Sequence, residues 1–311
     1  MKSLIVYNIC GIANRQDLKK YEESLDSIVS QNDFHEKYDL VISSCKSSPT
    51  VLEYLKGLDF NPAIYEISDV VPVNVSFNSA CLKAKELNKE DYVSYIYVDS
   101  GVFLKDPNSL NLLVQDILET DSAMTCTMVE NDMNLKQWEL EIEQENSNRY
   151  NIPVGKATNL HFQAFSKELV DFYGKPVPDI FASFCTESTF SFMCAALQKS
   201  WTILKNIEVG HRISMDGASS GFNPKQAHIT LGTTADHGFA INSILDRLLT
   251  QEAHDYGFGY EEFRGIMIHD PECYDSNGYC KNDDLKTWIK DKLFLSEQEF
   301  NYEEMSWELI N

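Results

Sequence analysis

Asp99 is the residue of this sequence that is best placed to do chemistry. It directly follows a mostly aromatic and β-branched run, Tyr92 to Val98, and it precedes the small pair Ser100-Gly101. Such a run predicts a strand buried on both faces, and open α/β sheets bind ligands just outside the carboxyl ends of their strands. A carboxylate there suits a hard divalent cation. Asp-Ser-Gly is also ordinary turn chemistry, so this stretch alone leaves a turn and a metal ligand equally open.

Glu187 is the candidate general base. It follows Thr186, a good N-cap, and opens a predicted helix that runs to Leu197 and is almost wholly apolar or small. Such a helix is expected to be buried, and a carboxylate at its N-terminus can accept a proton. The structural alternative is that Glu187 only complements the helix dipole in the first turn.

Histidines offer the second type of metal ligand. His211 follows a predicted strand over 201–209 and ranks first, His269 ranks second and His237 third. His161 is interpreted as structural or acceptor-facing. A histidine after a strand is often only a hydrogen-bonded structural residue, and that alternative applies to each of them.

Short strands that alternate with helices must position these side chains. This alternation predicts βαβ units and a mainly parallel sheet. The predicted strands cover residues 4–7, 38–44, 62–67, 92–98, 122–128, 161–165, 201–209, 228–232 and 263–268. The predicted helices cover residues 14–29, 50–58, 77–87, 166–170, 186–197 and 235–249. The charged segment 131–150 is expected to be an exposed helix that ends in a mobile loop at 145–151.

Composition excludes several classes of partner. The chain has 311 residues, 43% of them hydrophobic, which is enough for a sizeable core. Its net charge of −22 argues against nucleic acid and anionic membranes as non-specific partners. No apolar run approaches the roughly 18 residues that span a bilayer, and the N-terminus resembles a first strand more than a secretory signal. We therefore expect a soluble, cytoplasmic protein without a transmembrane segment.

The eight cysteines are expected to be buried free thiols. Cys273 and Cys280 lie near His269, but their spacing fits no zinc motif, so a structural zinc is not expected there.

The order and spacing of these features over about residues 2–212 resemble the GT-A superfamily of nucleotide-sugar glycosyltransferases. Tyr95-Ile-Tyr-Val-Asp99-Ser-Gly101 is similar to the Asp-X-Asp motif of that superfamily, and Asn78 lies in a helix shortly before it. Thr186-Glu187-Ser188 is similar to the acidic motif of inverting members, and His211 lies where several members place a metal ligand. The sequence departs from the pattern at Gly101, which replaces the second aspartate, and at Ser188.

The resemblance implies a Rossmann-like GT-A domain over 1–245, with a donor-nucleotide half at 1–118 and an acceptor half at 119–245. Residues 246–311 would form a C-terminal extension that packs on the body. It implies Mn²⁺ or Mg²⁺ on Asp99 and His211, with His269 as the alternative ligand. The donor-binding residues would be Asn8, Arg15, Ser43, Asn78, Asp99, Ser100 and Gly101. For Arg15, a plain surface arginine at a strand-to-helix turn is the alternative.

The implied activity is sugar transfer from a nucleotide-diphosphate donor to a hydroxyl of a glycan or another acceptor. Metal would stabilise the leaving diphosphate, and Glu187 would act as base in an inverting displacement. The loop at 216–221 would close over the donor, or is a plain surface loop.

Three alternatives remain open. One is a sugar nucleotidyltransferase, although Cys10 to Arg15 lacks a glycine-rich basic loop. The second is a non-catalytic binding or scaffold protein whose site has decayed at Gly101. The third, a transferase acting on bases in DNA, is disfavoured by the acidic charge.

Overall fold

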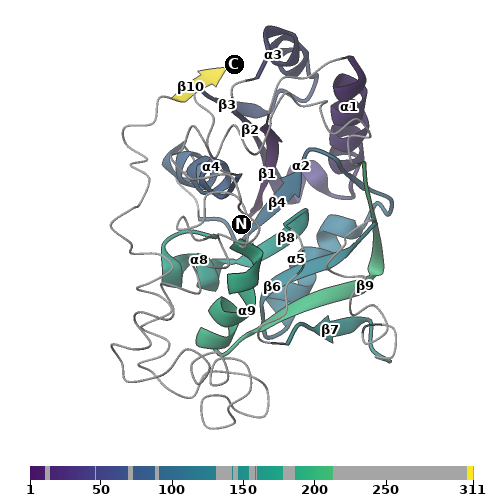
Figure 1. The fold of residues 1–311 in the computed structure, drawn as a ribbon, viewed down its shortest axis with the longest axis vertical. Coiled ribbons are helices and arrows are strands. Elements are labelled where there is room, and N and C mark those ends of the chain that lie inside the picture. Colours follow the sequence, from purple (N-terminus) through teal and green to yellow (C-terminus); the bar gives the residue numbers. More distant parts are fainter. Residues whose placement is uncertain are drawn as a thin grey trace, which may run out of the picture.

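The architecture was obtained from a computed structural model. It describes residues 1–10, 15–45, 47–68, 73–87, 91–130, 142, 146–153, 158, 160–177, 186–212 and 307–310, and it leaves the side chains of 10, 15–17, 87, 186–189, 192 and 307–310 undescribed. Within these ranges a single curled sheet runs through the molecule and helices cover both of its faces (Figure 1). No helix in this part of the chain is long and apolar enough to cross a bilayer.

The strands follow the hydrophobic pattern closely. They are β1 (Ser3–Cys10), β2 (Tyr38–Cys45), β3 (Ala63–Ile67), β4 (Ser94–Asp99), β5 (Val102–Leu104), β6 (Ser122–Val129), β7 (Arg149–Asn151), β8 (Phe162–Ser166), β9 (Ser200–His211) and β10 (Trp307–Ile310).

The helices fill the intervals between these strands. They are α1 (Arg15–Val29), α2 (Phe34–Lys37), α3 (Pro49–Lys56), α4 (Val73–Leu87), α5 (Ser109–Glu119), α8 (Lys167–Tyr173) and α9 (Thr186–Ala196). Ser48 and Ser166 cap α3 and α8, because each side chain accepts the backbone N–H three residues further on.

The sheet is mixed. Its order is β10-β3-β2-β1-β4-β8-β6-β9-β5, with β7 paired to β9. The run β3-β2-β1-β4 is parallel, as predicted, and β6 is parallel to β9. β8 is antiparallel to both β4 and β6, and β10, β5 and β7 are antiparallel to their neighbours. The carboxyl end of β4 therefore lies beside the amino end of β8.

Both faces of the sheet are apolar because each face carries helices. Along β1, Leu4 and Val6 belong to the core under α4, α8 and α9, while Ile5 and Tyr7 belong to the core under α1, α3 and α5. Full burial of such a side chain contributes about 1.5–3 kcal/mol. This two-sided burial explains why the central strands are continuous apolar runs.

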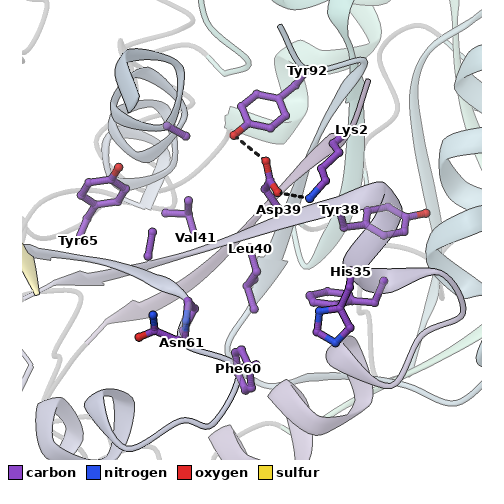
Figure 2. A pocket seen from close by; sticks show the side chains of 14 residues that line it. Lys2, His35, Tyr38, Asp39, Leu40, Val41, Phe60, Asn61, Tyr65 and Tyr92 are labelled. Atoms are coloured by element: carbon purple, nitrogen blue, oxygen red, sulfur yellow. Dashed lines mark hydrogen bonds and ion pairs between the residues drawn. The ribbon is translucent and has the colours of Figure 1, made fainter. Parts of the chain in front are cut away.

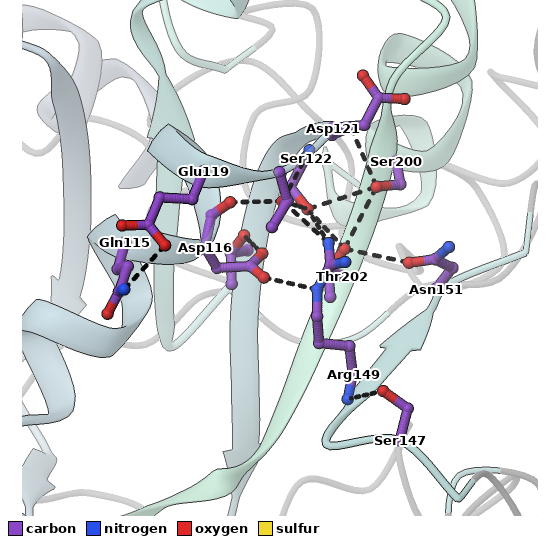
Figure 3. A network of polar contacts seen from close by, with 12 residues as sticks. Gln115, Asp116, Glu119, Asp121, Ser122, Ser147, Arg149, Asn151, Ser200 and Thr202 are labelled. Atoms are coloured by element: carbon purple, nitrogen blue, oxygen red, sulfur yellow. Dashed lines mark hydrogen bonds and ion pairs between the residues drawn. The ribbon is translucent and has the colours of Figure 1, made fainter.

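A polar network joins α5 to β6, β7 and β9 (Figure 3). Arg149 Nε lies 2.6 Å from Asp116 Oδ1, and Arg149 Nη2 donates to Thr120 Oγ1 at 2.9 Å and to Ser122 Oγ at 3.0 Å. Thr125 Oγ1 donates to Asp116 Oδ2 at 2.7 Å. Asp116 is nearly fully buried, so these partners replace the water that its carboxylate loses.

Some predicted elements differ from the structure. The expected loop at 145–151 contains β7, and β5, α2, α5 and β10 were not predicted. The expected strands at 228–232 and 263–268, the helix at 235–249 and the loop at 216–221 lie outside the described residues, as does most of 131–145. Cys45, Cys81, Cys126 and Cys194 are buried free thiols, as expected. The domain boundaries at 118 and 245 stay predictions.

Candidate functional site

Asp99 ends β4 at the carboxyl edge of the parallel strands. Its backbone is opposite Asn8 of β1, and its N–H donates to the carbonyl of His161 at 2.8 Å. His161 immediately precedes β8, which is antiparallel to β4. The register of these two strands therefore places Asp99 and His161 side by side.

β9 brings the third residue to the same place. After the turn at Ser100-Gly101 the chain forms β5, which pairs with the end of β9 so that Val102 faces His211. The N–H of Arg212 donates to the carbonyl of Gly101 at 2.9 Å, which extends this pairing to the turn itself. His211, although distant in sequence, thus lies next to Asp99.

Asp99, His161 and His211 form a compact cluster. Asp99 Oδ2 lies 3.3 Å from His161 Nδ1 and 3.4 Å from His211 Nε2, and the two imidazole rings stack with centroids 4.2 Å apart. One donor atom from each residue lies within 4.8 Å of the others. Two imidazole nitrogens and one carboxylate oxygen are a ligand set that fits a divalent metal ion. About a third of the Asp99 side chain is exposed, which leaves room for further ligands on the ion.

The histidines also control the charge of Asp99. Burial alone would raise the pKa of the Asp99 carboxyl, but hydrogen bonds and charge interactions with His161 and His211 outweigh this effect. They hold the pKa well below its usual range, so Asp99 is ionised at neutral pH. An ionised carboxylate is the form that a metal ion requires.

Gly101 occupies a place that no side chain can fill. A Cβ there would lie 2.7 Å from the carbonyl oxygen of Arg212 and 3.0 Å from His211 Nε2. The position where the Asp-X-Asp motif carries its second aspartate is therefore filled by the end of β9. The glycine is what allows His211 to approach Asp99.

Restoring an aspartate at Gly101 is expected to damage the site. In Gly101→Asp the new side chain must displace His211 or the backbone of Arg212, so affinity for Mn²⁺ should fall by about 10–100-fold instead of rising. Calorimetric titration of Mn²⁺ into the variant measures this. Gly57→Ala is the control for a glycine change, since its Cβ meets only carbonyl oxygens at 3.4 and 3.5 Å. Tighter Mn²⁺ binding in Gly101→Asp would contradict the steric argument.

α1 and β1 hold the turn in place. The buried hydroxyl of Tyr7 donates to the carbonyl of Ser100 at 3.0 Å, and the hydroxyl of Ser24 donates to the carbonyl of Val102. Burial raises the pKa of Tyr7 well above its usual range, so it remains a donor. Arg212 Nη2 also pairs with Glu23 Oε2 of α1 at 2.6 Å. The turn that follows Asp99 is thus fixed from three sides.

Three of the predicted donor-binding residues are buried, two of them on strands beneath α4 and one on α4 itself. Asn8 Oδ1 accepts from Ser76 Oγ at 2.7 Å, and Ser43 Oγ lies 2.7 Å from the same hydroxyl. Asn78 makes two hydrogen bonds to the backbone of Val177, at 2.7 and 3.2 Å. All three side chains are at most 2% exposed, so the structure gives them a bracing role, and their donor contact stays a prediction.

Other predicted residues are only partly described. Arg15 opens α1 and Glu187 lies in the first turn of α9, but both side chains lie outside the described residues. His237 and His269 lie outside them entirely. The assignment of Glu187 as base therefore stays a prediction.

His161 is the residue whose place the sequence interpretation missed. It was taken as structural or acceptor-facing, yet its ring is one of the two nearest to Asp99. The signal was present, because His161 begins a predicted strand. It becomes informative only once that strand is known to run antiparallel to β4.

A pocket of about 390 Å³ lies at the opposite edge of the sheet (Figure 2). It surrounds the amino ends of β1, β2 and β3, where Lys2 Nζ pairs with Asp39 Oδ1 at 2.8 Å and the hydroxyl of Tyr92 donates to Asp39 Oδ2 at 3.3 Å. Phe60, His35 and Asn61 line it further. Because parallel strands have all their carboxyl ends at one edge, this pocket is separate from the Asp99 cluster.

Solved structures resemble this arrangement. A mannosyltransferase from Pyrobaculum calidifontis, in complex with GDP-Man and Mn²⁺, matches 70% of this chain with a TM-score of 0.53 and 13% identity. GalNAc-T7 with UDP, GalNAc and Mn²⁺ matches 94% with a TM-score of 0.53 and 11% identity. S. aureus TarS 1-349 in complex with UDP-GlcNAc matches 74% with a TM-score of 0.51 and 14% identity.

The chain has a GT-A fold. At these identities the likeness concerns the fold alone, and the matches cover 58%, 54% and 64% of those three chains, less than two thirds of each. The predicted fold class is confirmed, with the correction that the GT-A sheet here is mixed and that its parallel pairs are those within β3-β2-β1-β4 and the pair β6-β9. No protein-family model and no curated protein matches the sequence.

Proposed function

We propose that this protein is a metal-dependent glycosyltransferase that moves a sugar from a nucleotide-diphosphate donor to a hydroxyl of a glycan or other acceptor. The observation that carries the proposal is the Asp99–His161–His211 cluster at the carboxyl end of the central strand of a GT-A fold. Structural neighbours solved with GDP-Man and Mn²⁺, with UDP-GlcNAc, and with UDP, GalNAc and Mn²⁺ support it. Ligands of open α/β sheets bind at this edge.

Asp99 and His211 would hold the divalent cation, for which the resemblance to GT-A enzymes implies Mn²⁺ or Mg²⁺. When bound, such a cation acts as a Lewis acid that stabilises negative charge on the leaving diphosphate. Asp99 contributes an ionised oxygen, and Gly101 leaves the space in which His211 reaches it. Ser100 and Gly101 offer a turn with little side-chain bulk beside the donor phosphates. Because the net charge of the protein is −22, a metal ion or a few local cations must neutralise the donor diphosphate.

Glu187 would accept the proton of the acceptor hydroxyl while that oxygen forms its bond to the anomeric carbon. The bond from the anomeric carbon to the diphosphate oxygen breaks in the same step, so the anomeric centre inverts. The position of Glu187 in the first turn of the largely buried helix α9 supports this role. Arg15, the first residue of α1, would offer a cation to the donor phosphates.

A thermal-shift screen tests the donor site. Nucleoside diphosphates and nucleotide sugars are added with Mn²⁺, with Mg²⁺ or with chelator, and a true donor should raise the melting temperature only with metal. At 100 times its dissociation constant a ligand stabilises the folded state by about 2.7 kcal/mol, a shift of several degrees. Release of nucleoside diphosphate with a matched acceptor, and the anomeric configuration of the product by NMR, then test transfer and inversion.

Three outcomes would count against the proposal. If no nucleotide shifts the protein, or if the shift ignores metal, a binding or scaffold role replaces transfer. Turnover of a nucleoside triphosphate with a sugar phosphate would instead indicate a sugar nucleotidyltransferase. A product that retains the donor's anomeric configuration would remove Glu187 as the base of a single displacement.

A further inference from the structure

We propose that the Asp99–His161–His211 cluster selects a transition-metal dication and rejects Mg²⁺ and Ca²⁺, and that His161 is the third ligand that sets this preference. The inference deepens the proposed function, because it concerns the metal site which that function uses. It leaves the identity of the sugar and of the acceptor aside.

The separations within the cluster match those of ligands that share one ion. His161 Nδ1 and His211 Nε2 approach the same carboxylate oxygen, Asp99 Oδ2, at 3.3 and 3.4 Å. Two ligand atoms on metal bonds of about 2.1 Å lie roughly 3.0–3.4 Å apart at octahedral or tetrahedral angles. Both histidine nitrogens thus stand at ligand-to-ligand distance from Asp99 Oδ2, and all three donor atoms lie within 4.8 Å of one another.

The types of ligand decide which ion is preferred. Imidazole nitrogen suits Co²⁺, Zn²⁺, Fe²⁺ and, more weakly, Mn²⁺, whereas Mg²⁺ and Ca²⁺ require mainly oxygen. Among the described residues Asp99 is the only carboxylate in the cluster, and it offers one oxygen to both histidines. Mg²⁺, which loses its water reluctantly, gains too little from a single carboxylate to bind here.

Within the described part of the chain, the fold keeps a second carboxylate out of this ligand set. A second carboxylate cannot arise at Gly101, because its Cβ would meet Arg212 and His211 at 3.0 Å or less. The remaining place is taken by His161, whose carbonyl accepts the N–H of Asp99 at 2.8 Å and whose ring stacks on His211. Backbone and ring contacts together fix His161 toward Asp99, so it is placed to act as a ligand.

The test is metal binding to the protein without any nucleotide. Free Mn²⁺ is followed by its electron paramagnetic resonance signal, and Co²⁺ by its visible absorption, with Mg²⁺ and Ca²⁺ as competitors. We expect Mn²⁺ and Co²⁺ to bind, and about 100-fold excess Mg²⁺ to displace little of either. His161→Ala should weaken Co²⁺ by about 10–100-fold, and His161→Asp should lower the ratio of Co²⁺ to Mg²⁺ affinity.

Two further variants make the result interpretable. His35→Ala removes an exposed histidine at the opposite edge of the sheet and should leave all affinities unchanged. His161→Asn keeps a polar side chain of similar size and serves if His161→Ala does not fold, as judged by circular dichroism.

The proposal is overturned if wild type binds no dication, or if Mg²⁺ competes as well as Co²⁺. It is overturned equally if the His161 variants keep the wild-type affinity ratio. These outcomes are separate from the proposed function, since no sugar transfer is measured. Selective metal binding in a protein that shows no sugar transfer would contradict the proposed function and would still support this inference.

Discussion

Asp99→Ala is expected to abolish metal-dependent binding of the donor and to lower sugar transfer by about 10³-fold, the upper end of the loss seen when one electrostatic stabiliser is removed. The variant loses the only carboxylate that the described cluster contains, and it leaves two imidazoles as the remaining ligands of that cluster. Donor binding is measured by thermal shift with Mn²⁺, and transfer by release of nucleoside diphosphate.

Asp39→Ala is the matched control for this change. Asp39 has a side-chain exposure of 31%, close to the 33% of Asp99, and it also lies at a strand end, but at the opposite edge of the sheet. We expect Asp39→Ala to keep the metal response. An Asp99→Ala protein that still binds donor only when metal is present would show that the cation is held elsewhere.

Arg149→Ala is expected to lower the free energy of unfolding by about 3 kcal/mol, because it leaves the buried Asp116 carboxylate without its cation. The side chain of Asp116 is 4% exposed and that of Arg149 is 37% exposed, so some water can replace the guanidinium. This places the loss at the lower end for a broken buried pair. Urea unfolding monitored by circular dichroism measures it.

A double variant separates the ion pair from lost packing. Asp116→Leu with Arg149→Met removes both charges, and it should recover at least half of the stability that Arg149→Ala loses. Lys19→Ala, which breaks an exposed pair with Glu23 at 3.8 Å, should change stability by less than about 0.5 kcal/mol. Equal losses in Arg149→Ala and Lys19→Ala would mean that the network is not desolvated in solution.

Sequence analysis located the parallel strands well because they are buried on both faces. Runs such as the one before Asp99 are uninterrupted and end abruptly, which marks the functional edge of the sheet. β5 has three residues, and β7 is the polar sequence Arg149-Tyr-Asn151. Neither carries a periodic signal, and both are strands only because β9 pairs with them.

The residues of the candidate site are brought together by the register between strands that are far apart in sequence, and the sequence alone does not show this register. In the sequence, Gly101 indicates only that the second aspartate of the Asp-X-Asp motif is missing, because the sequence does not show which residues lie next to this glycine in space. Only the pairing of Val102 with His211 and of β4 with β8 reveals that this glycine makes room for a histidine and that a second histidine lies beside it. Asp99 and His211 could be predicted as metal ligands because each follows a predicted strand. The place of His161 beside them could be recognised only from the sheet topology.

The strand β10 makes the far edge of the sheet depend on a segment that is distant in sequence from the neighbouring strands. β3 pairs with β2 on one side and with Trp307–Ile310 on the other, although β3 is complete by Ile67. During synthesis on the ribosome, β3 has no partner on that side until some 240 further residues have been made. A chain that lacks Trp307–Ile310 would expose this edge of β3 to pairing with other chains, so β10 protects the sheet against edge-to-edge association.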